Sequence, residues 1–560
     1  MATKKKSTAK KRPATKRKPS ATRRAAAKKR PAAKKRKPAA TERANAVKPA
    51  KGSAAKGVAY KPSVAGLAAA AAQVEMMEPR PKTTGRYPIS NEAFDRIKAA
   101  APKAKLRRVT AVKTKDAKKR RAANAQSMMP EAAGSEPTAA PTASTNFTSI
   151  TATGWLPPDC TMAVGPSHVL ASVNSSVAIA TKAGAPLMQK TLTQWFSNIV
   201  QGLTIFDPKA LYDQHAGRWV LMAVAVSSSP QTSLHLVSIS ATSDPTGTWR
   251  NYKFDAMKNG ATPTSNWADF PALGVDNKAL YITSNMFAFG GGFQYSKIRV
   301  IPKAGPYAGS VAPYFDFWNM KNANNTVAFT IQPCHTFGAP QAEYLANTGF
   351  PSASYLTIWK IVNGGTTPTL TRTQVTVSSY SLAPNADQPG GATPLNTGDV
   401  RVLHAVFRGN SIWTSFTTAH NWGTGPNRAS IQWCQVNPST PTVLQQGVYG
   451  AAAGHYFYPA MCPDGNGNVT MALCRSGPAE FATIAYTGRL ATDPAGTMQG
   501  SAVLKAGVAK YVSLDGGGRN RWGDYNGVAA DPSNSRVVWF YSMYASALNT
   551  WGTWVGSAFF

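Results

Sequence analysis

The amino-acid sequence predicts an all-β protein: a seven-bladed β-propeller, with six blades as the alternative, preceded by a long disordered basic N-terminal arm. Three observations predict this architecture. Short apolar runs fill the chain beyond residue 150, a weak repeat recurs there, and positive charge is concentrated in the first 125 residues. All fourteen tryptophans lie at or beyond Trp155, so the buried core is expected in that part of the chain.

Short strands account for most of the region beyond residue 150. Typical apolar runs are 220–226, 233–239 and 355–361. Turn residues of the Gly, Pro, Asn and Asp kind separate these runs, as they do in antiparallel sheets. Helices longer than about three turns are not expected, because no amphipathic pattern of that length occurs.

A weak repeat relates segments 162–170, 210–219 and 272–281. Each is a small apolar run that leads into a polar turn and then into a strand. Further copies begin near Phe337, Val402, Pro459 and Asn526. The starts lie roughly 50 to 65 residues apart, which suits the four short strands of a propeller blade. A large sandwich or jelly roll is the alternative.

The charge divides sharply along the chain. Residues 1–125 hold 38 basic and 6 acidic side chains, whereas the remainder holds 24 and 19. A segment so rich in Lys, Ala and Pro cannot bury a core, and it is expected to stay disordered. Residues 126–146 are predicted as a flexible linker and 147–560 as the propeller, with one short helix at 91–100 capped by Ser90 or Asn91.

The basic arm is predicted to bind nucleic acid or another polyanion without sequence preference, because clustered cations release condensed counterions. Acidic polysaccharide, anionic lipid and acidic protein surfaces are the other polyanions considered, and a merely solubilising arm is the alternative. Aromatic residues are absent from residues 1–59, which argues against base stacking. The expected contact residues are Lys4, Lys5, Lys6, Lys10, Lys11, Arg12, Lys16, Arg17, Lys18, Arg23, Arg24, Lys28, Lys29, Arg30, Lys34, Lys35, Arg36, Lys37, Arg107, Arg108, Lys118, Lys119, Arg120 and Arg121.

Five cysteines occur, an odd number without a CxxC pair or zinc-like histidine spacing. Buried free thiols are the simplest interpretation, and a Cys462–Cys474 disulfide is the alternative. The longest apolar stretch near the N-terminus, 64–72, is too short for a membrane span and lies too far along the chain for a signal peptide.

Two copies of the repeat share more than a period. Segment 267–276 begins Trp-Ala-Asp-Phe-Pro, and segment 522–531 begins Trp-Gly-Asp-Tyr-Asn. Together with 519–525 and 551–557, these motifs resemble bacterial β-propeller proteins of sialidase-like architecture over about 150–558. The resemblance implies the fold; members of that group usually look secreted or surface-bound. The arm separately resembles linker-histone tails in composition.

Asp269 and Asp524 are the candidate ligand-binding carboxylates. Each lies between aromatic residues at the start of an expected inner strand, where propeller loops meet a central channel. They could bind a polar ligand or Ca²⁺, the only metal or cofactor considered. The alternative is that they cap backbone amides. Arg521, His455 and Tyr456 are expected at the same mouth.

No catalytic residue is predicted. A glycosidase needs a pair of carboxyl groups flanking the scissile bond, and past residue 137 the only glutamates are Glu343 and Glu480. Asp399 and Glu480 join Asp269 and Asp524 as the carboxylates to test. Phosphate-loop, dinucleotide-binding and Ser-His-Asp patterns are not evident.

The sequence therefore favours a non-enzymatic, intracellular, nucleic-acid-associated protein whose propeller mediates protein, glycan or self-association. A secreted or surface propeller that binds envelope polysaccharide is one alternative. A sialidase-like glycoside hydrolase is the second.

Overall fold

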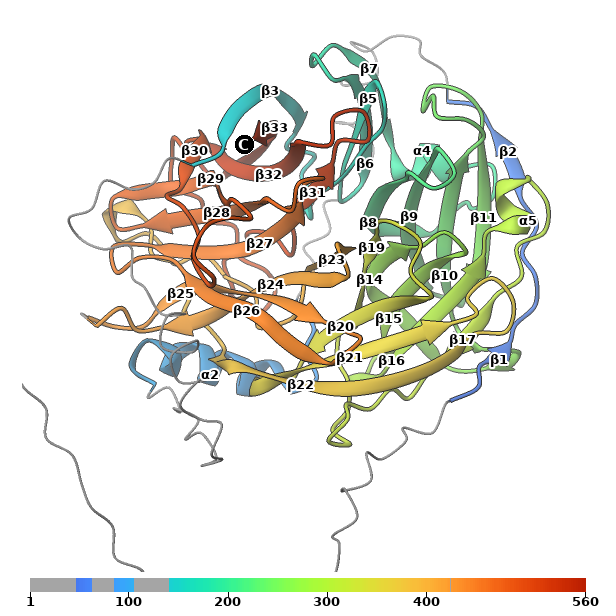
Figure 1. The fold of residues 1–560 in the computed structure, drawn as a ribbon, viewed down its shortest axis with the longest axis horizontal. Coiled ribbons are helices and arrows are strands. Elements are labelled where there is room, and N and C mark those ends of the chain that lie inside the picture. The colour runs from blue at the N-terminus through green and yellow to red at the C-terminus, as the bar shows by residue number, and fades with distance from the viewer. Residues whose placement is uncertain (1–46, 63–84, 105–139, 424) are drawn as a thin grey trace, which may run out of the picture. The chain divides into compact units, whose positions relative to one another are not determined.

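The computed structural model describes residues 47–62, 85–104, 140–423 and 425–560. Antiparallel sheets dominate it, and inner strands of successive sheets contact one another in the manner of a propeller (Figure 1). The predicted all-β propeller is therefore confirmed. Within the described residues, no helix is long and apolar enough to cross a membrane.

Five sheets have the size of a single blade. Their strands, in spatial order, are β4 (Thr161–Val164), β5 (His168–Val173), β6 (Ser176–Thr181) and β7 (Pro186–Thr191); β2 (Val58–Tyr60), β11 (Trp249–Asp255), β10 (Gln231–Ser240), β9 (Arg218–Ser228) and β8 (Thr204–Asp213); β18 (Gln332–Pro333), β20 (Ala342–Thr348), β21 (Ser352–Val362) and β22 (Thr369–Ser381); β27 (His455–Pro463), β28 (Val469–Gly477), β29 (Glu480–Arg489) and β30 (Ala502–Lys505); β3 (Thr142–Thr151), β33 (Thr550–Phe559), β32 (Val537–Ala547) and β31 (Gly527–Ala530).

The sixth large sheet has ten strands. In order they are β1 (Ala50–Lys51), β17 (Phe315–Phe317), β16 (Phe293–Pro302), β15 (Ala279–Ala288), β14 (Asn266–Val275), β19 (His335–Thr336), β23 (His404–Arg408), β24 (Ser411–His420), β25 (Arg428–Asn437) and β26 (Thr442–Tyr449). The short strand β19 pairs in parallel with β14 and β23, and so joins an antiparallel run of five strands to one of four. The predicted seven or six separate blades are thus not found: five blade-sized sheets stand alone, because these runs merge.

Helices and small strands complete the described elements: α2 (Asn91–Ala100), η1 (Ala101–Lys103), α4 (Leu192–Phe196), α5 (Ala304–Tyr307), η2 (Pro389–Gly391), β12 (Lys258–Asn259) and β13 (Thr262–Pro263). α4 begins at a capping box, in which Thr191 and Gln194 satisfy each other's backbone amides. α2 begins after Ser90, whose Oγ accepts from Ala93 N.

Two strands far apart in the sequence are joined in one sheet. β3 pairs with β33, so strands some 400 residues apart in sequence hold the ring together. Thr553 Oγ1 donates to the Ile150 carbonyl at 2.6 Å, and the Ile150 side chain is buried. This pairing begins at Thr142, ahead of the predicted boundary at 147.

Two segments assigned to the disordered arm are also part of the folded unit. β1 and β2 extend the outer edges of two sheets, and Val47 bridges to Leu370 on a third. Pairing of this kind covers edge strands that would otherwise be open. The predicted arm boundary is corrected accordingly: residues 47–62 and 85–104 pack on the propeller because their backbone and apolar groups find partners there.

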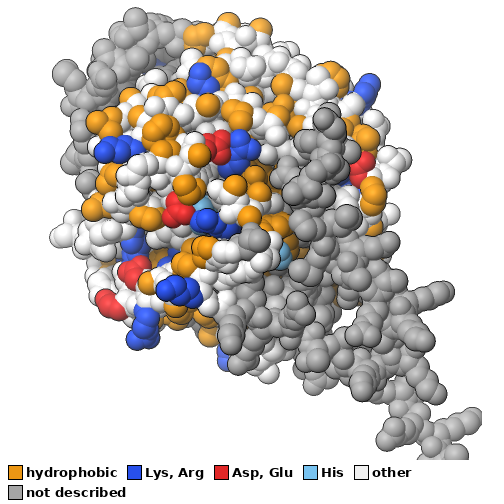
Figure 2. Space-filling view, turned by 90° about the vertical axis from the view of Figure 1, so that its left-hand side faces the viewer, with side chains coloured by type: hydrophobic (Ala, Val, Ile, Leu, Met, Phe, Trp, Pro, Cys, Tyr) orange, Lys and Arg blue, Asp and Glu red, His pale blue; other side chains and the backbone are white. Residues whose placement is uncertain are grey.

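All five cysteines are free and buried, so the predicted free thiols are confirmed and the Cys462–Cys474 alternative is not formed. On the face shown in Figure 2, the described basic and acidic side chains stand singly or in small mixed groups. The predicted polyanion-binding residues all lie outside the described residues, and their role stays a prediction.

Candidate functional site

A cavity of about 310 Å³ opens where inner strands and the loops before them converge. β8, β14 and β27 contribute to it, as do the loops before β23 and β31. Its lining includes the acidic and basic residues Arg86, Asp207, Asp269, Asp399, Arg401, Arg521 and Asp524. Seven aromatic residues also line it: Tyr87, Trp155, Phe206, Trp267, Phe270, Phe287 and Tyr458.

Three inner strands carry the same backbone irregularity at this cavity. Asp207, Phe270 and Tyr458 have φ values of 51°, 50° and 51°, in the left-handed region. Each lies where its strand slips register against the next one. Proline follows each of them and cannot donate to the sheet ladder. Such positions cost about 1–3 kcal/mol each and are typical of functional sites.

Asp207 is the most perturbed carboxyl group lining the cavity. Its Oδ2 accepts a hydrogen bond from Phe270 N at 3.2 Å, and the residue is 7% exposed. Burial raises the pKa of Asp207 to about 8; the nearby carboxylates of Asp269 and Asp524 add to the rise, and Lys209 opposes it. Asp207 therefore holds a proton at neutral pH and can donate it.

Asp269 and Asp524 also line the cavity and are more exposed than Asp207. Burial raises the pKa of Asp269, and Arg86, with Nε 3.6 Å from Oδ2, opposes that rise. The two oxygens of Asp524 accept from Nη2 of Arg521 at 2.9 and 2.8 Å. Carboxyl groups with different partners thus share one cavity, the usual arrangement when one acts as acid and another as base.

Asp399 and Arg401 form a buried ion pair beside these groups. Arg401 Nε lies 2.9 Å from each Asp399 oxygen, and its Nη2 lies 2.7 Å from Oδ2. The guanidinium also lies 4.2 Å from the Phe270 ring centroid and 4.8 Å from that of Phe329. Arg401 is therefore fixed, and its charge is neutralised within the site.

The structure brings together three of the five predicted mouth residues, namely Asp269, Arg521 and Asp524. His455 and Tyr456 are not in this lining: His455 Nδ1 accepts from Ala429 N, and the Tyr456 ring packs on Tyr449. Their strand β27 enters the cavity further along, at Tyr458, so that part of the prediction is wrong.

Of the other carboxylates, Asp399 lies in the cavity, whereas Glu480 pairs with Arg475 on the β28–β29 hairpin. Among the described residues, no group of three or more His, Cys, Asp or Glu side chains could hold a metal ion. The Ca²⁺ expected at Asp269 and Asp524 stays a prediction.

Sequence reasoning missed Asp207, Arg401 and Arg86. The sequence does contain a signal for Asp207: like Phe270, it directly precedes a proline within an inner strand. Arg86 carries no such signal, since it comes from the segment assigned to the arm.

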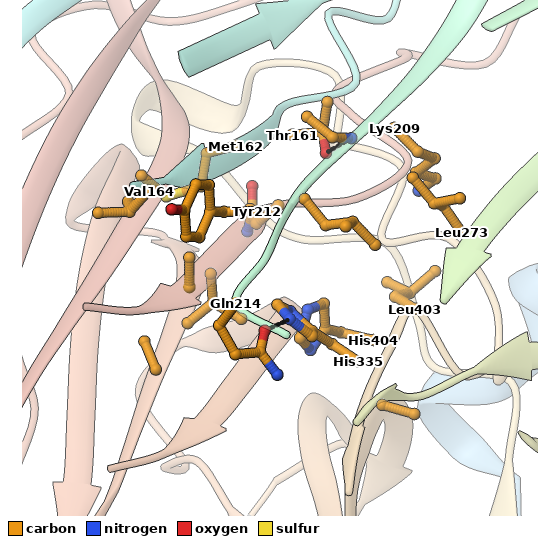
Figure 3. Close-up of a pocket in the computed structure, with 18 of the residues that line it drawn as sticks. Thr161, Met162, Val164, Lys209, Tyr212, Gln214, Leu273, His335, Leu403 and His404 are labelled. Atoms are coloured by element: carbon orange, nitrogen blue, oxygen red, sulfur yellow. Dashed lines mark hydrogen bonds between the residues drawn. The ribbon is translucent and has the colours of Figure 1, made fainter. Parts of the chain in front are cut away.

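A second, smaller cavity of about 50 Å³ adjoins the first through Leu403, which lines both (Figure 3). Figure 3 shows His335 beside Gln214, whose Oε1 lies 2.8 Å from His335 Nε2. Burial lowers the pKa of His335 to about 3, that of His404 to about 4 and that of Lys209 to about 7. Both imidazoles are therefore neutral at physiological pH.

No family model matches the sequence, and no curated protein matches it. Solved structures similar to the fold include an α-L-arabinofuranosidase of Fusarium graminearum with an iminosugar inhibitor (9% identity, 74% of this chain and 97% of that one, TM-score 0.34). A second is a Hadza microbial sialidase (11% identity, 70% of this chain and 73% of that one, TM-score 0.34). A third is a quinohemoprotein alcohol dehydrogenase of Comamonas testosteroni (8% identity, 70% of this chain and 65% of that one, TM-score 0.33).

The prediction of a non-enzymatic scaffold is not retained: it stands against these comparisons, in which the three structures named above are enzymes and two of them are glycosidases. A likeness at such low identity concerns the fold alone, and one fold carries unrelated chemistries. The function is therefore inferred from the side chains of this cavity.

Proposed function

We propose that the protein is a glycoside hydrolase whose active site is the 310 Å³ cavity, with Asp207 as general acid and Asp269 as base or nucleophile. The observation that carries the proposal is the buried carboxyl of Asp207 in the lining of the same cavity as Asp269; burial raises the pKa of Asp207 to about 8. Glycoside cleavage needs this division of roles: one carboxyl protonates the leaving oxygen, and the other acts at the sugar carbon or on water.

The cavity walls suit a carbohydrate. Sugars present both apolar C–H faces and hydroxyl groups, and the cavity combines ring faces such as Trp267 and Phe287 with fixed polar groups. Its three arginines each face an aspartate: Arg86 faces Asp269, and the other pairs are Arg401–Asp399 and Arg521–Asp524. Because an aspartate neutralises each arginine, the cavity favours a neutral sugar over the carboxylated sugar that a sialidase-like enzyme would take.

The test is hydrolysis of a defined panel: arabinobiose and arabinohexaose, which two of the similar structures hold, and an aryl sialoside. Activity should be lost by about 10²- to 10⁴-fold in Asp207→Asn and Asp269→Asn, the usual contribution of an acid or base. Asp255→Asn is the matched control, since Asp255 pairs with Lys258 outside the cavity lining. Activity that survives both cavity substitutions would refute the assignment.

A further inference from the structure

The cavity lining includes a side chain from the N-terminal part of the chain, that of Arg86, which is 44% exposed. The Arg86 guanidinium carbon lies 4.6 Å from the Trp267 ring centroid and 5.8 Å from that of Phe287. Its Nε is 3.6 Å from Asp269 Oδ2. A cation over aromatic rings and beside a carboxylate has the contacts of a bound ligand.

The backbone on both sides of Arg86 is also held. Its carbonyl accepts from Arg401 Nη2 at 3.2 Å. The Tyr87 ring stacks on Phe94 with centroids 3.6 Å apart, and both residues are buried. At Gly85, an added Cβ would lie 2.7 Å from Arg521 Nη1, so the chain passes close to the cavity arginines.

Helix α2 and the residues that follow it anchor this segment beside the cavity. Asp95 accepts from Arg519 Nε and Nη2 at 2.7 and 3.0 Å. Lys98 Nζ donates to Thr397 Oγ1 at 2.7 Å and to the Gly398 carbonyl at 2.9 Å. Asn427 Nδ2 donates to the Ala101 and Ala104 carbonyls at 2.7 and 2.9 Å. The anchor and the inserted arginine can therefore be altered separately.

We infer that Arg86 is an internal ligand, and that segment 85–104 inhibits the cavity by keeping Arg86 on the face of Trp267. A sugar that stacks on this indole needs the same ring face, so Arg86 must leave before the sugar binds. The identity of the excluded molecule as a sugar rests on the proposed function; the contact of the Arg86 guanidinium with the Trp267 ring does not.

The first experiment tests the occupation alone. In Arg86→Ala, ethylguanidinium chloride at millimolar concentration should bind in the vacated place and raise the melting temperature. It should leave the wild type and Arg96→Ala unchanged; Arg96 is an exposed arginine on α2 and gives the same loss of charge. Calorimetric titration with ethylguanidinium gives an independent measure. An Arg86→Ala protein that is folded but does not bind ethylguanidinium overturns the inference.

The second experiment tests inhibition, with arabinohexaose and the aryl sialoside as substrates. Arg86→Ala and Asp95→Ala should each raise kcat/KM, Arg86→Ala by roughly tenfold, because a competing self-ligand no longer has to be displaced. A fall in kcat/KM in Arg86→Ala would mean that Arg86 helps to bind the substrate, and would overturn the inhibitory role. If no protein cleaves any substrate while ethylguanidinium still binds only to Arg86→Ala, the internal ligand is supported and the hydrolase proposal fails.

Discussion

The carboxylate of Asp207 accepts a hydrogen bond from the amide of Phe270 across two neighbouring inner strands. Both residues have left-handed backbone conformations, and both precede a proline. The bond joins the irregular points of β8 and β14. A backbone amide therefore holds the Asp207 carboxyl, the proposed acid, in place. The hydrogen bond from Phe270 by itself lowers the pKa of Asp207, and burial of the carboxyl outweighs it and raises that pKa.

Asp207 should make stability depend on pH. Its folded-state pKa of about 8 exceeds the ordinary value of 3.8, so the folded protein binds the proton more tightly between these values. Stability should therefore fall as pH rises from about 4 to 8. Asp207→Asn should flatten this slope in urea unfolding measured between pH 5 and 6, below the pKa of about 7 to which burial lowers Lys209. An unchanged slope in that variant would show that Asp207 is ionised in the folded state.

Removing Arg401 should destabilise the protein more than removing the whole ion pair. Arg401→Met leaves Asp399 buried without its partner, which typically costs about 3–5 kcal/mol. The double variant Asp399→Asn/Arg401→Met removes both charges and should lose clearly less. Urea unfolding of the two single variants and the double variant measures the coupling, and additive losses would contradict it.

Truncation of Trp522 should destabilise the protein more than truncation of Trp267. Trp522 is fully buried, with its ring 4.9 Å from Tyr511, so Trp522→Ala should cost about 3–5 kcal/mol. Trp267 is 8% exposed and lines the cavity, so its truncation should cost less. Thermal unfolding compares the two variants. Equal losses would place Trp267 in the core rather than in the wall of the cavity.

The sequence predicted the fold class better than the site. Alternating short strands and turn residues indicate a propeller, because each blade is a local antiparallel unit. The parallel pairing of β19 with two neighbours depends on tertiary contacts, and it explains why the blade count differed. The Trp-x-Asp repeat located Asp269 and Asp524, since equivalent positions of inner strands converge on one axis.

The remaining site residues depend on contacts that local sequence does not encode. Arg86 reaches the cavity because α2 docks on the propeller through Asp95, Lys98 and Phe94. Composition did not indicate the role of this helix, because a basic, Ala-rich segment has few apolar residues. Here a single buried Phe and paired charges are enough to dock the helix on the propeller.

Docking of α2 should weaken as pH falls towards 7. Burial lowers the pKa of Lys98 to about 7, and the charges of Asp399 and Asp95 oppose this decrease. Burial also lowers the pKa of nearby His455, which is therefore neutral in this pH range. A released helix would have an ordinary lysine near 10.5, so between about 7 and 10.5 the released state binds more protons, and docking strengthens as pH rises. Hydrogen exchange of α2 amides, corrected for intrinsic rates, should therefore show stronger protection at pH 9 than at pH 7. Lys98→Met should remove this difference while leaving β-sheet protection unchanged. If protection in the wild type is equal at the two pH values, Lys98 is charged in the docked state, and the two hydrogen bonds to Thr397 and Gly398 compensate for its burial.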